Sequence, residues 1–231
     1  MIQKILTGSD CIDNSLNRGI SPESVALVYG EAETGKSTFA MQCAVNCALQ
    51  GSKVLYVDCD GTFSAKRLSQ LAAEKFDEIA ELIILVKPKD FREQTAFIDR
   101  LAEYAVNNIG LVVIDTVTSL YRVKVAETSG KAFGLNRELN RQMAIVAQTA
   151  RVKKIPVLVV SQVRSVFSEI EGAIEPVGTR VLKFWADIII AMKPTEDQQV
   201  IKAVLEKSRE QREMTCYLRM SATGIHDDPF Y

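Results

Sequence analysis

Residues 30–37 read Gly-Glu-Ala-Glu-Thr-Gly-Lys-Ser and match the pattern G-x-x-x-x-G-K-S/T at every fixed position. The apolar, β-rich run Val25–Tyr29 precedes them, and a helical pattern follows from Ser37 to Leu49, before Gly51. In a strand, loop and helix of this kind, main-chain N–H groups at the positive end of the helix dipole surround phosphate oxygens. The segment therefore predicts a nucleoside triphosphate site, and an ordinary glycine-bearing turn is the less favoured alternative.

Two oxygen ligands for Mg²⁺ are expected beside this loop. Lys36 should reach the β- and γ-phosphates, and the Ser37 hydroxyl should bind the metal. Asp115 follows the buried run Leu111–Ile114, where a parallel strand meets the ligand-binding edge of its sheet. An aspartate often ends a strand for local reasons alone, but the loop upstream favours the metal role here. The predicted phosphate-binding residues are Gly30, Glu31, Ala32, Glu33, Thr34, Gly35, Lys36, Ser37 and Thr38.

Two further acids follow the predicted strand Val54–Asp58. Asp58 and Asp60 are two residues apart, so on an extended strand both point to the same side, towards the nucleotide edge. One of them would orient the water that attacks the γ-phosphate. The alternative is that both acids simply begin the turn at Gly61, and the spacing does not separate these interpretations.

The rest of the chain alternates strand-like and helical patterns, which is typical of a parallel sheet covered on both faces. Strands are expected at Val25–Tyr29, Val54–Asp58, Ile83–Val86, Leu111–Ile114, Val157–Val160 and Ile188–Met192. Helices are expected over Phe91–Asn107 and Leu135–Val152, and the runs Val200–Leu205 and Thr215–Arg219 predict an antiparallel C-terminal edge. The predicted fold class is α/β, with residues 1–231 forming one domain.

The composition is typical of a cytoplasmic globular protein without an overall excess of charge. There is no secretory signal pattern, and no apolar run approaches the roughly 18 residues of a membrane span. Five cysteines without C-x-x-C spacing predict reduced thiols, and Cys43 and Cys47 are expected in the core rather than at a metal. Because the formal net charge is −1, any nucleic-acid binding must come from local charge.

Five segments resemble the recombinase core of the RecA and RadA family, in the same order and at similar spacing. They are Thr7–Ser9, Gly30–Ser37, Asp58–Phe63, Asp115–Arg122 and Ser161–Val163. The resemblance is strongest to the RadB family, archaeal paralogues that begin directly at this core. Only six residues precede Thr7, too few for the N-terminal helix-hairpin-helix domain and aromatic polymerisation motif of RadA-like recombinases. The resemblance implies a RecA-like P-loop NTPase core without the usual route to filaments.

The resemblance also implies roles for single residues, with ATP and Mg²⁺ as cofactors. Lys36 matches a catalytic phosphate ligand, and Gln162 matches the glutamine that senses the γ-phosphate and relays its presence to DNA-binding loops. Arg67 matches an arginine that packs on adenine, and its alternative is a solvated side chain. Asp60 stands where active recombinases carry glutamate. Because aspartate is one methylene shorter, its carboxylate falls roughly 1.5 Å short, which predicts slow turnover.

DNA contacts are expected from two loops. Residues 118–183 carry eleven Lys and Arg against five Asp and Glu. The resemblance implies that residues 122–131 correspond to the first DNA-binding loop of the family and residues 164–178 to the second. Phe133 or Phe167 would stack on the bases of single-stranded DNA, bound irrespective of sequence. Three glutamates between 169 and 175 oppose phosphate contact, and a solvated loop is the alternative. The cations expected to contact phosphates are Arg122, Lys124, Lys131 and Arg164.

Lys207-Ser208-Arg209 is similar to a segment of clock-type RecA-like ATPases, in which the lysine and arginine reach a neighbouring subunit's γ-phosphate. A solvated charge run is the slightly favoured alternative. Three functions stay open. The favoured one is a RadB-like accessory protein that binds DNA, hydrolyses ATP weakly and assists a RadA-type recombinase. A full strand-exchange recombinase and an assembly ATPase without DNA are the others, and a homo-oligomer is compatible with each.

Overall fold

The computed structural model describes residues 4–106, 108–128, 132–164, 175–176, 178–208 and 213–230. The strands are β1 (Val25–Gly30), β2 (Lys53–Asp58), β3 (Ile83–Val86), β4 (Ile109–Asp115), β5 (Val157–Arg164), β6 (Glu175–Pro176), β7 (Ile188–Pro194), β8 (Val200–Lys207), β9 (Met214–Ser221) and β10 (Gly224–Asp227). The helices are α1 (Asp10–Ser15), α2 (Lys36–Leu49), α3 (Ala65–Ala72), the 3-10 turn η1 (Ala73–Lys75), α4 (Phe76–Leu82), α5 (Phe91–Asp99), α6 (Leu101–Tyr104), α7 (Ser119–Glu127), α8 (Ala132–Lys153) and α9 (Thr179–Trp185).

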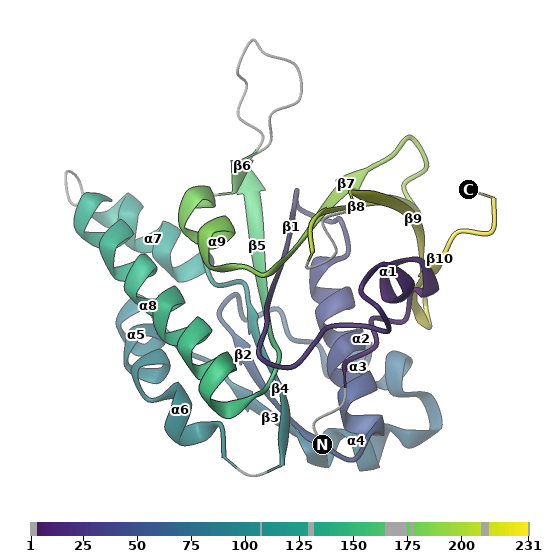
Figure 1. Cartoon of the computed structure of the whole chain (residues 1–231), viewed down its shortest axis with the longest axis horizontal. Coiled ribbons are helices and arrows are strands. Elements are labelled where there is room, and N and C mark those ends of the chain that lie inside the picture. Colours follow the sequence, from purple (N-terminus) through teal and green to yellow (C-terminus); the bar gives the residue numbers. More distant parts are fainter. Residues whose placement is uncertain are drawn as a thin grey trace.

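The strands form one sheet in the order β10-β9-β8-β7-β1-β5-β4-β2-β3, and β6 pairs with the end of β5 (Figure 1). From β7 to β3 the neighbours are parallel, whereas β8, β9 and β10 add in antiparallel fashion beyond β7. The register places Gly30 at the end of β1 between Gln162 of β5 and Met192 of β7. Since parallel strands share a carboxyl edge, the polar residues that follow them meet there.

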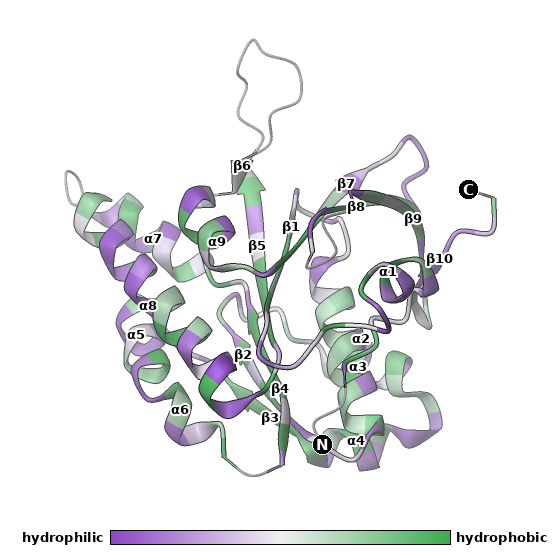
Figure 2. Cartoon of the chain, in the orientation of Figure 1, coloured by the Kyte–Doolittle hydropathy of each residue, from purple (hydrophilic) through white to green (hydrophobic). Residues whose placement is uncertain are grey.

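Helices cover both faces of this sheet. α1 to α4 lie on one side and α5 to α9 on the other (Figure 1). Successive residues of β1 show the division, because Ala26 and Val28 pack into the cluster that contains α2, and Leu27 and Tyr29 into the cluster that contains α8. Strands buried on both faces need apolar side chains throughout, and Figure 2 shows the central strands predominantly green. Among the described residues, none of the helices combines the length and hydropathy that a membrane span needs.

Every strand predicted from the sequence is present, and the α/β class with an antiparallel C-terminal edge is confirmed. The prediction of one helix over Phe91–Asn107 is wrong. The backbone of Arg100 leaves the helical region (φ −108°, ψ 11°) and separates α5 from α6. The short helices α1, α3, α4, α7 and α9 and the short strands β6 and β10 were not predicted individually, because such short segments show little periodicity.

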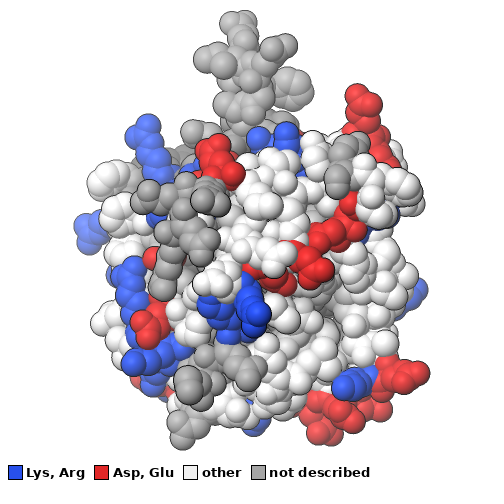
Figure 3. Space-filling model, turned by 45° about the vertical axis from the view of Figure 1, so that its right-hand side comes forward, with Lys and Arg blue, Asp and Glu red and all other residues white. Residues whose placement is uncertain are grey.

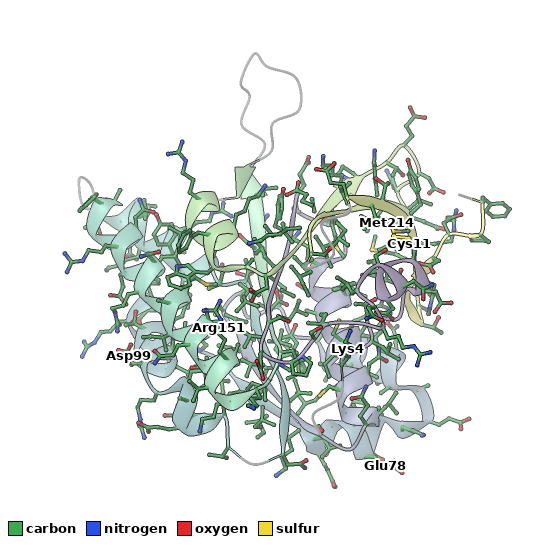
Figure 4. All side chains as sticks on the ribbon, in the orientation of Figure 1. Lys4, Cys11, Glu78, Asp99, Arg151 and Met214 are labelled. Carbon is green, nitrogen blue, oxygen red and sulfur yellow. A yellow bond between two sulfur atoms is a disulfide. The ribbon has the colours of Figure 1, made fainter. Side chains whose placement is uncertain are left out.

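Two of the five cysteines are joined to each other. Cys11 in α1 and Cys216 in β9 form a disulfide between residues 205 positions apart (Figure 4). The prediction of reduced thiols is therefore wrong for this pair, because residues so distant in sequence meet only through the fold. Cys43, Cys47 and Cys59 are free and buried, as predicted. In the described part of the chain, no group of three or more His, Cys, Asp or Glu side chains is arranged to hold a metal.

Alkylation of the denatured protein without reductant is expected to label Cys43, Cys47 and Cys59, and reduction should expose the other two. Cys216→Ser should lower the free energy of unfolding by about 2–4 kcal/mol, because the unfolded chain is no longer restricted by a closed loop. Mass spectrometry counts the labels, and urea titration measures the stability. Five labels before reduction would contradict the disulfide.

Candidate functional site

The phosphate loop joins the end of β1 to the start of α2, and both of its fixed glycines are required by their surroundings. A Cβ on Gly30 would lie 2.1 Å from the carbonyl oxygen of Met192. Gly35 has φ +78°, in the left-handed region, and a Cβ there would lie 2.8 Å from Met220 Sδ. Gly35 is also the N-cap of α2, and no side chain caps this helix end. The first N–H groups of the helix therefore have no side-chain cap to compete with a bound anion.

Lys36, the first residue of α2, lies over the loop. Its ammonium donates to the Glu31 carbonyl oxygen and, at 3.2 Å, to Thr34 Oγ1, and the residue is only 7% exposed. Burial lowers the pKa of Lys36 to about 8, although the Asp115, Asp60 and Glu31 carboxylates raise it. Nearby acids thus compensate the buried ammonium only in part. A triphosphate would supply the missing negative charge.

Asp115 ends β4 beside the loop and meets the other predicted magnesium ligand. Ser37 Oγ donates to Asp115 Oδ1 at 3.3 Å, Tyr56 OH donates to Oδ2 at 2.7 Å, and Thr116 Oγ1 donates to Oδ1 at 3.2 Å. Burial raises the pKa of Asp115, and the hydrogen bonds lower it. The Ser37 and Asp115 oxygens are of the kind that Mg²⁺ prefers, and a buried carboxylate gains from a nearby cation. The donor set therefore fits Mg²⁺ bound together with phosphate oxygens.

The two acids after β2 have different surroundings. Asp58 accepts from two main-chain N–H groups of the following turn at 3.0 and 3.1 Å, and Lys87 Nζ lies 3.5 Å from its Oδ2. Asp58 therefore stabilises the turn, as the local interpretation of these acids expected. Asp60 is exposed, and its charge contributes to raising the pKa of both Lys36 and Asp115. The charge of Asp60 thus acts on both Lys36 and Asp115, and its role towards water stays a prediction.

Gln162 lies beside the phosphate loop and contacts one of the predicted DNA-binding residues. It pairs in register with Gly30, near the end of β5. Its Oε1 accepts from Arg122 Nη1 at 3.4 Å. The preceding residue, Ser161, lies 3.1 Å from Thr118 in the turn before α7, measured between the hydroxyl oxygens. Gln162, the predicted γ-phosphate sensor, is therefore hydrogen-bonded directly to Arg122 of α7.

The predicted DNA-binding residues are only partly described. Arg122 and Lys124 belong to α7, so the expected loop is wrong for this part of residues 122–131. The helix is anchored by Tyr121, which is buried and packs edge-to-face on Phe91. Lys124 pairs with Glu127 at 3.1 Å. Lys131 and Phe167 lie outside the described residues, as does most of the second loop, and the side chain of Arg164 in β5 is not described.

Arg67 is partly exposed to solvent, and its side chain is held by hydrogen bonds to the fold. Its guanidinium donates to the carbonyl oxygens of Ser221 at 2.9 Å and Ala222 at 2.7 Å, in the turn between β9 and β10, and to Gln70 Oε1 at 3.1 Å. Hydrogen bonds to a guanidinium lie in its plane and leave its faces available for stacking. The expected contact with adenine is compatible with this arrangement and stays a prediction.

Lys207 is not brought to the phosphate loop of its own chain. It ends β8, which runs away from the loop edge, and pairs in register with Ile189 at the start of β7. Its ammonium donates to the carbonyl oxygen of Ala186. A contact with a γ-phosphate would therefore need a second subunit. Arg209, the other half of this predicted pair, lies outside the described residues.

Two features of the site were missed by the sequence predictions. One is Tyr56, whose only signal was a tyrosine in a buried strand, where the hydroxyl must find a partner. The other is a hollow of about 420 Å³ beside the loop, lined by Glu31–Thr34, by residues between Pro194 and Ile201, and by Met220. Its walls come from segments far apart in sequence, so no local pattern could reveal it.

Comparison with known proteins places this arrangement in a family. A family model described as Rad51 matches residues 1–228. The chain belongs to the Rad51 family. It is 34% identical over 225 residues to the DNA repair and recombination protein RadB of Thermococcus kodakarensis, covering 96% of this chain and 98% of the relative. It is 33% identical over 210 residues to RadB of Methanobrevibacter smithii, covering 89% of this chain and 88% of the relative.

A solved structure agrees with this assignment. The crystal structure of the RadB recombinase matches with a TM-score of 0.80 at 32% sequence identity, covering 99% of this chain and 100% of that chain. The resemblance to RadB and the RecA-like fold are confirmed.

The affinity for Mg·ATP is expected to fall as pH rises above about 8, where buried Lys36 loses its proton in the free protein. Because bound phosphate favours the ammonium, association takes up a proton there, and the affinity should fall by up to about tenfold per pH unit. Calorimetry between pH 7 and pH 9.5 measures this. Lys36→Arg is the control, since its guanidinium keeps its charge and should give a flat profile. A flat profile for the wild type would contradict the assignment.

Proposed function

We propose that this protein is an ATP-binding, weakly ATP-hydrolysing and DNA-binding accessory protein in homologous recombination and DNA repair, which assists or regulates a RadA-type recombinase. Membership of the Rad51 family, and similarity over nearly the whole chain to proteins named for DNA repair and recombination, support the process. The observation that carries the proposal is the convergence of an uncapped helix end, the Lys36 ammonium and the Ser37–Asp115 pair at one edge of the sheet.

Each of these groups has a task on Mg·ATP in this proposal. Main-chain N–H groups of the loop and Lys36 hold the phosphates, and Ser37 and Asp115 hold Mg²⁺, which withdraws charge from phosphate oxygens. The hollow beside Glu31–Thr34 has a volume of about 420 Å³, within the range of small-molecule sites, and would take the nucleoside. Arg67, fixed in plane by the β9–β10 turn, would present a face to adenine.

Weak hydrolysis follows from the position of Asp60 in this proposal. The charge of the exposed carboxylate acts on Lys36 and Asp115, but the side chain is one methylene shorter than the glutamate of active recombinases. A water held about 1 Å from its productive position loses on the order of a hundredfold in rate. ATP occupancy, rather than rapid turnover, would then be the signal that the protein carries.

DNA binding would depend on positive charge gathered at one site rather than on the net charge of the protein. Figure 3 shows Lys and Arg scattered among Asp and Glu over the face in view, in keeping with a net charge of −1. The Arg122–Gln162 hydrogen bond supports a local site whose state depends on nucleotide. When Gln162 turns to a γ-phosphate, Arg122 is released for a DNA phosphate. Phe133, which is 83% exposed at the start of α8, would stack on a base.

Single-stranded DNA is expected to bind more tightly in the presence of a nonhydrolysable ATP analogue than with ADP, at low salt and irrespective of sequence. Arg122→Ala should weaken binding and reduce the slope of log affinity against log salt by about 0.7, the value for one phosphate contact on a single strand. Fluorescence anisotropy over a salt series measures both. Arg151→Ala removes the same charge from the end of α8, at the opposite edge of the sheet, and should leave the slope unchanged. Absence of affinity at low salt with every nucleotide would end the DNA-binding proposal.

Asp60→Glu is expected to raise the ATPase rate by about tenfold or more, because the longer side chain restores the reach to the attacking water. Steady-state phosphate release measures the rate, and Asp60→Asn, which removes the charge at equal length, should lower it. The short Asp60 side chain predicts slow ATP hydrolysis in the wild type. A wild-type rate near the typical enzyme value of about 10 s⁻¹ would contradict this prediction.

A further inference from the structure

Three amide side chains, two on α2 and one on its C-cap residue Gln50, hold the N-terminal segment of the chain against this helix. Gln42, Asn46 and Gln50 follow one another at a spacing of four residues, so they line one face. Their amide nitrogens donate to the carbonyl oxygens of Thr7 at 2.9 Å, Leu6 at 2.9 Å and Lys4 at 3.2 Å, respectively. The segment before α1 therefore runs along the helix that begins at the phosphate loop.

Gln42 also holds the other end of the chain. Its Nε2 donates to the carbonyl oxygen of Ile225 at 2.8 Å, and its Oε1 accepts from the N–H of Ile225 at 2.7 Å. The space is tight, because a Cβ on Gly8 would lie 2.0 Å from Nε2 and a Cβ on Gly224 would lie 2.4 Å from Oε1. One amide, 7% exposed, thus makes three hydrogen bonds to the two ends of the chain.

Ile225 reaches the phosphate loop as well. A Cβ on Gly35 would lie 3.2 Å from Ile225 Cδ1 and 2.8 Å from Met220 Sδ, so the loop rests on side chains of β9 and β10. The same two strands are joined by the turn that Arg67 holds. The C-terminal hairpin therefore contacts the nucleotide-binding elements at three places. These are the phosphate loop, α3 and, through Gln42, a point six residues after the start of α2.

The two ends of the chain are joined directly to each other. The Ser9 hydroxyl donates to one oxygen of the Asp227 carboxylate, and the N–H of Cys11 donates to the other at 3.0 Å. The disulfide between α1 and β9 adds a covalent link. The segments 5–9 and 224–227 are thus linked to each other. In the described part of the chain, Gln42 is the α2 side chain that forms hydrogen bonds to both segments.

We propose that Gln42 is a positioning residue that couples nucleotide occupancy of the phosphate loop to the docking of both chain ends on α2. The inference rests on the proposed ATP binding. A ligand that fixes the first turn of α2 favours the arrangement in which Gly35 rests on Ile225 and Met220. Because Gln42 joins the same helix to the main chain of Ile225, docking of the ends and binding of the nucleotide strengthen each other reciprocally.

Hydrogen exchange of the full chain, oxidised throughout, tests the coupling with and without Mg·ATP. In the wild type, ATP should slow exchange at residues 30–37 and, remotely, at residues 5–9 and 224–227, with the Ile225 N–H slowed by about tenfold. In Gln42→Ala, ATP should still slow residues 30–37, but the effect on the chain ends should disappear and the Kd for ATP should rise by about tenfold. Asn46→Ala, the matched control, removes the bond to Leu6 alone and should retain the remote effect.

Gln42→Met keeps the length of the side chain without its hydrogen bonds and replaces the alanine variant if that variant does not fold. Protection confined to residues 30–37 in the wild type would overturn the coupling while leaving ATP binding intact. Remote protection that persists in both Gln42 variants would show that another contact carries it and would overturn the role of Gln42. No protection at residues 30–37 would refute the proposed function itself, and the inference with it.

Discussion

The uncapped amino end of α2 determines the kind of ligand that this edge of the sheet can bind. Its N–H groups have no side-chain acceptor, and Gly30 and Gly35 allow Met192 and Met220 to approach within distances that any Cβ would prevent. An anion is the natural ligand for such a helix end. The parallel register then brings the ends of β2, β4 and β5 to the same edge, so that acids and amides contributed by distant segments face that anion.

The electrostatics of this edge point to a ligand that carries both signs of charge. Burial lowers the pKa of Lys36 and raises the pKa of Asp115, so each group is shifted towards its neutral form. A triphosphate would compensate the ammonium, and a magnesium ion would compensate the carboxylate. In the proposed function, Mg·ATP would supply both of these charges. The C-terminal hairpin contacts α2 behind the loop through the hydrogen bonds between Gln42 and Ile225.

The local parts of this site could be predicted from sequence, and the parts made by distant contacts could not. Buried parallel strands appear as continuous apolar runs, so β1 and β4 could be predicted. Lys36 follows β1 and Asp115 ends β4, as the sequence indicated. The spacing of Asp58 and Asp60 left their roles open until hydrogen bonds assigned Asp58 to its turn. The Cys11–Cys216 disulfide, the bonds of Arg67 to the β9–β10 turn and the bonds of Gln42 to Ile225 join residues more than 150 positions apart, and no local pattern encodes such pairs.

Titration calorimetry of the folded protein with Mg·ATP at pH 7.5, beside Lys36→Ala, measures whether residues 30–37 bind phosphate. The wild type is expected to bind Mg·ATP at a single site per chain. The affinity should fall by at least about a hundredfold in the variant, which lacks a buried charged partner of the phosphates. Absence of binding to the wild type, or equal affinity in the two proteins, would contradict the assignment of residues 30–37 as a phosphate loop.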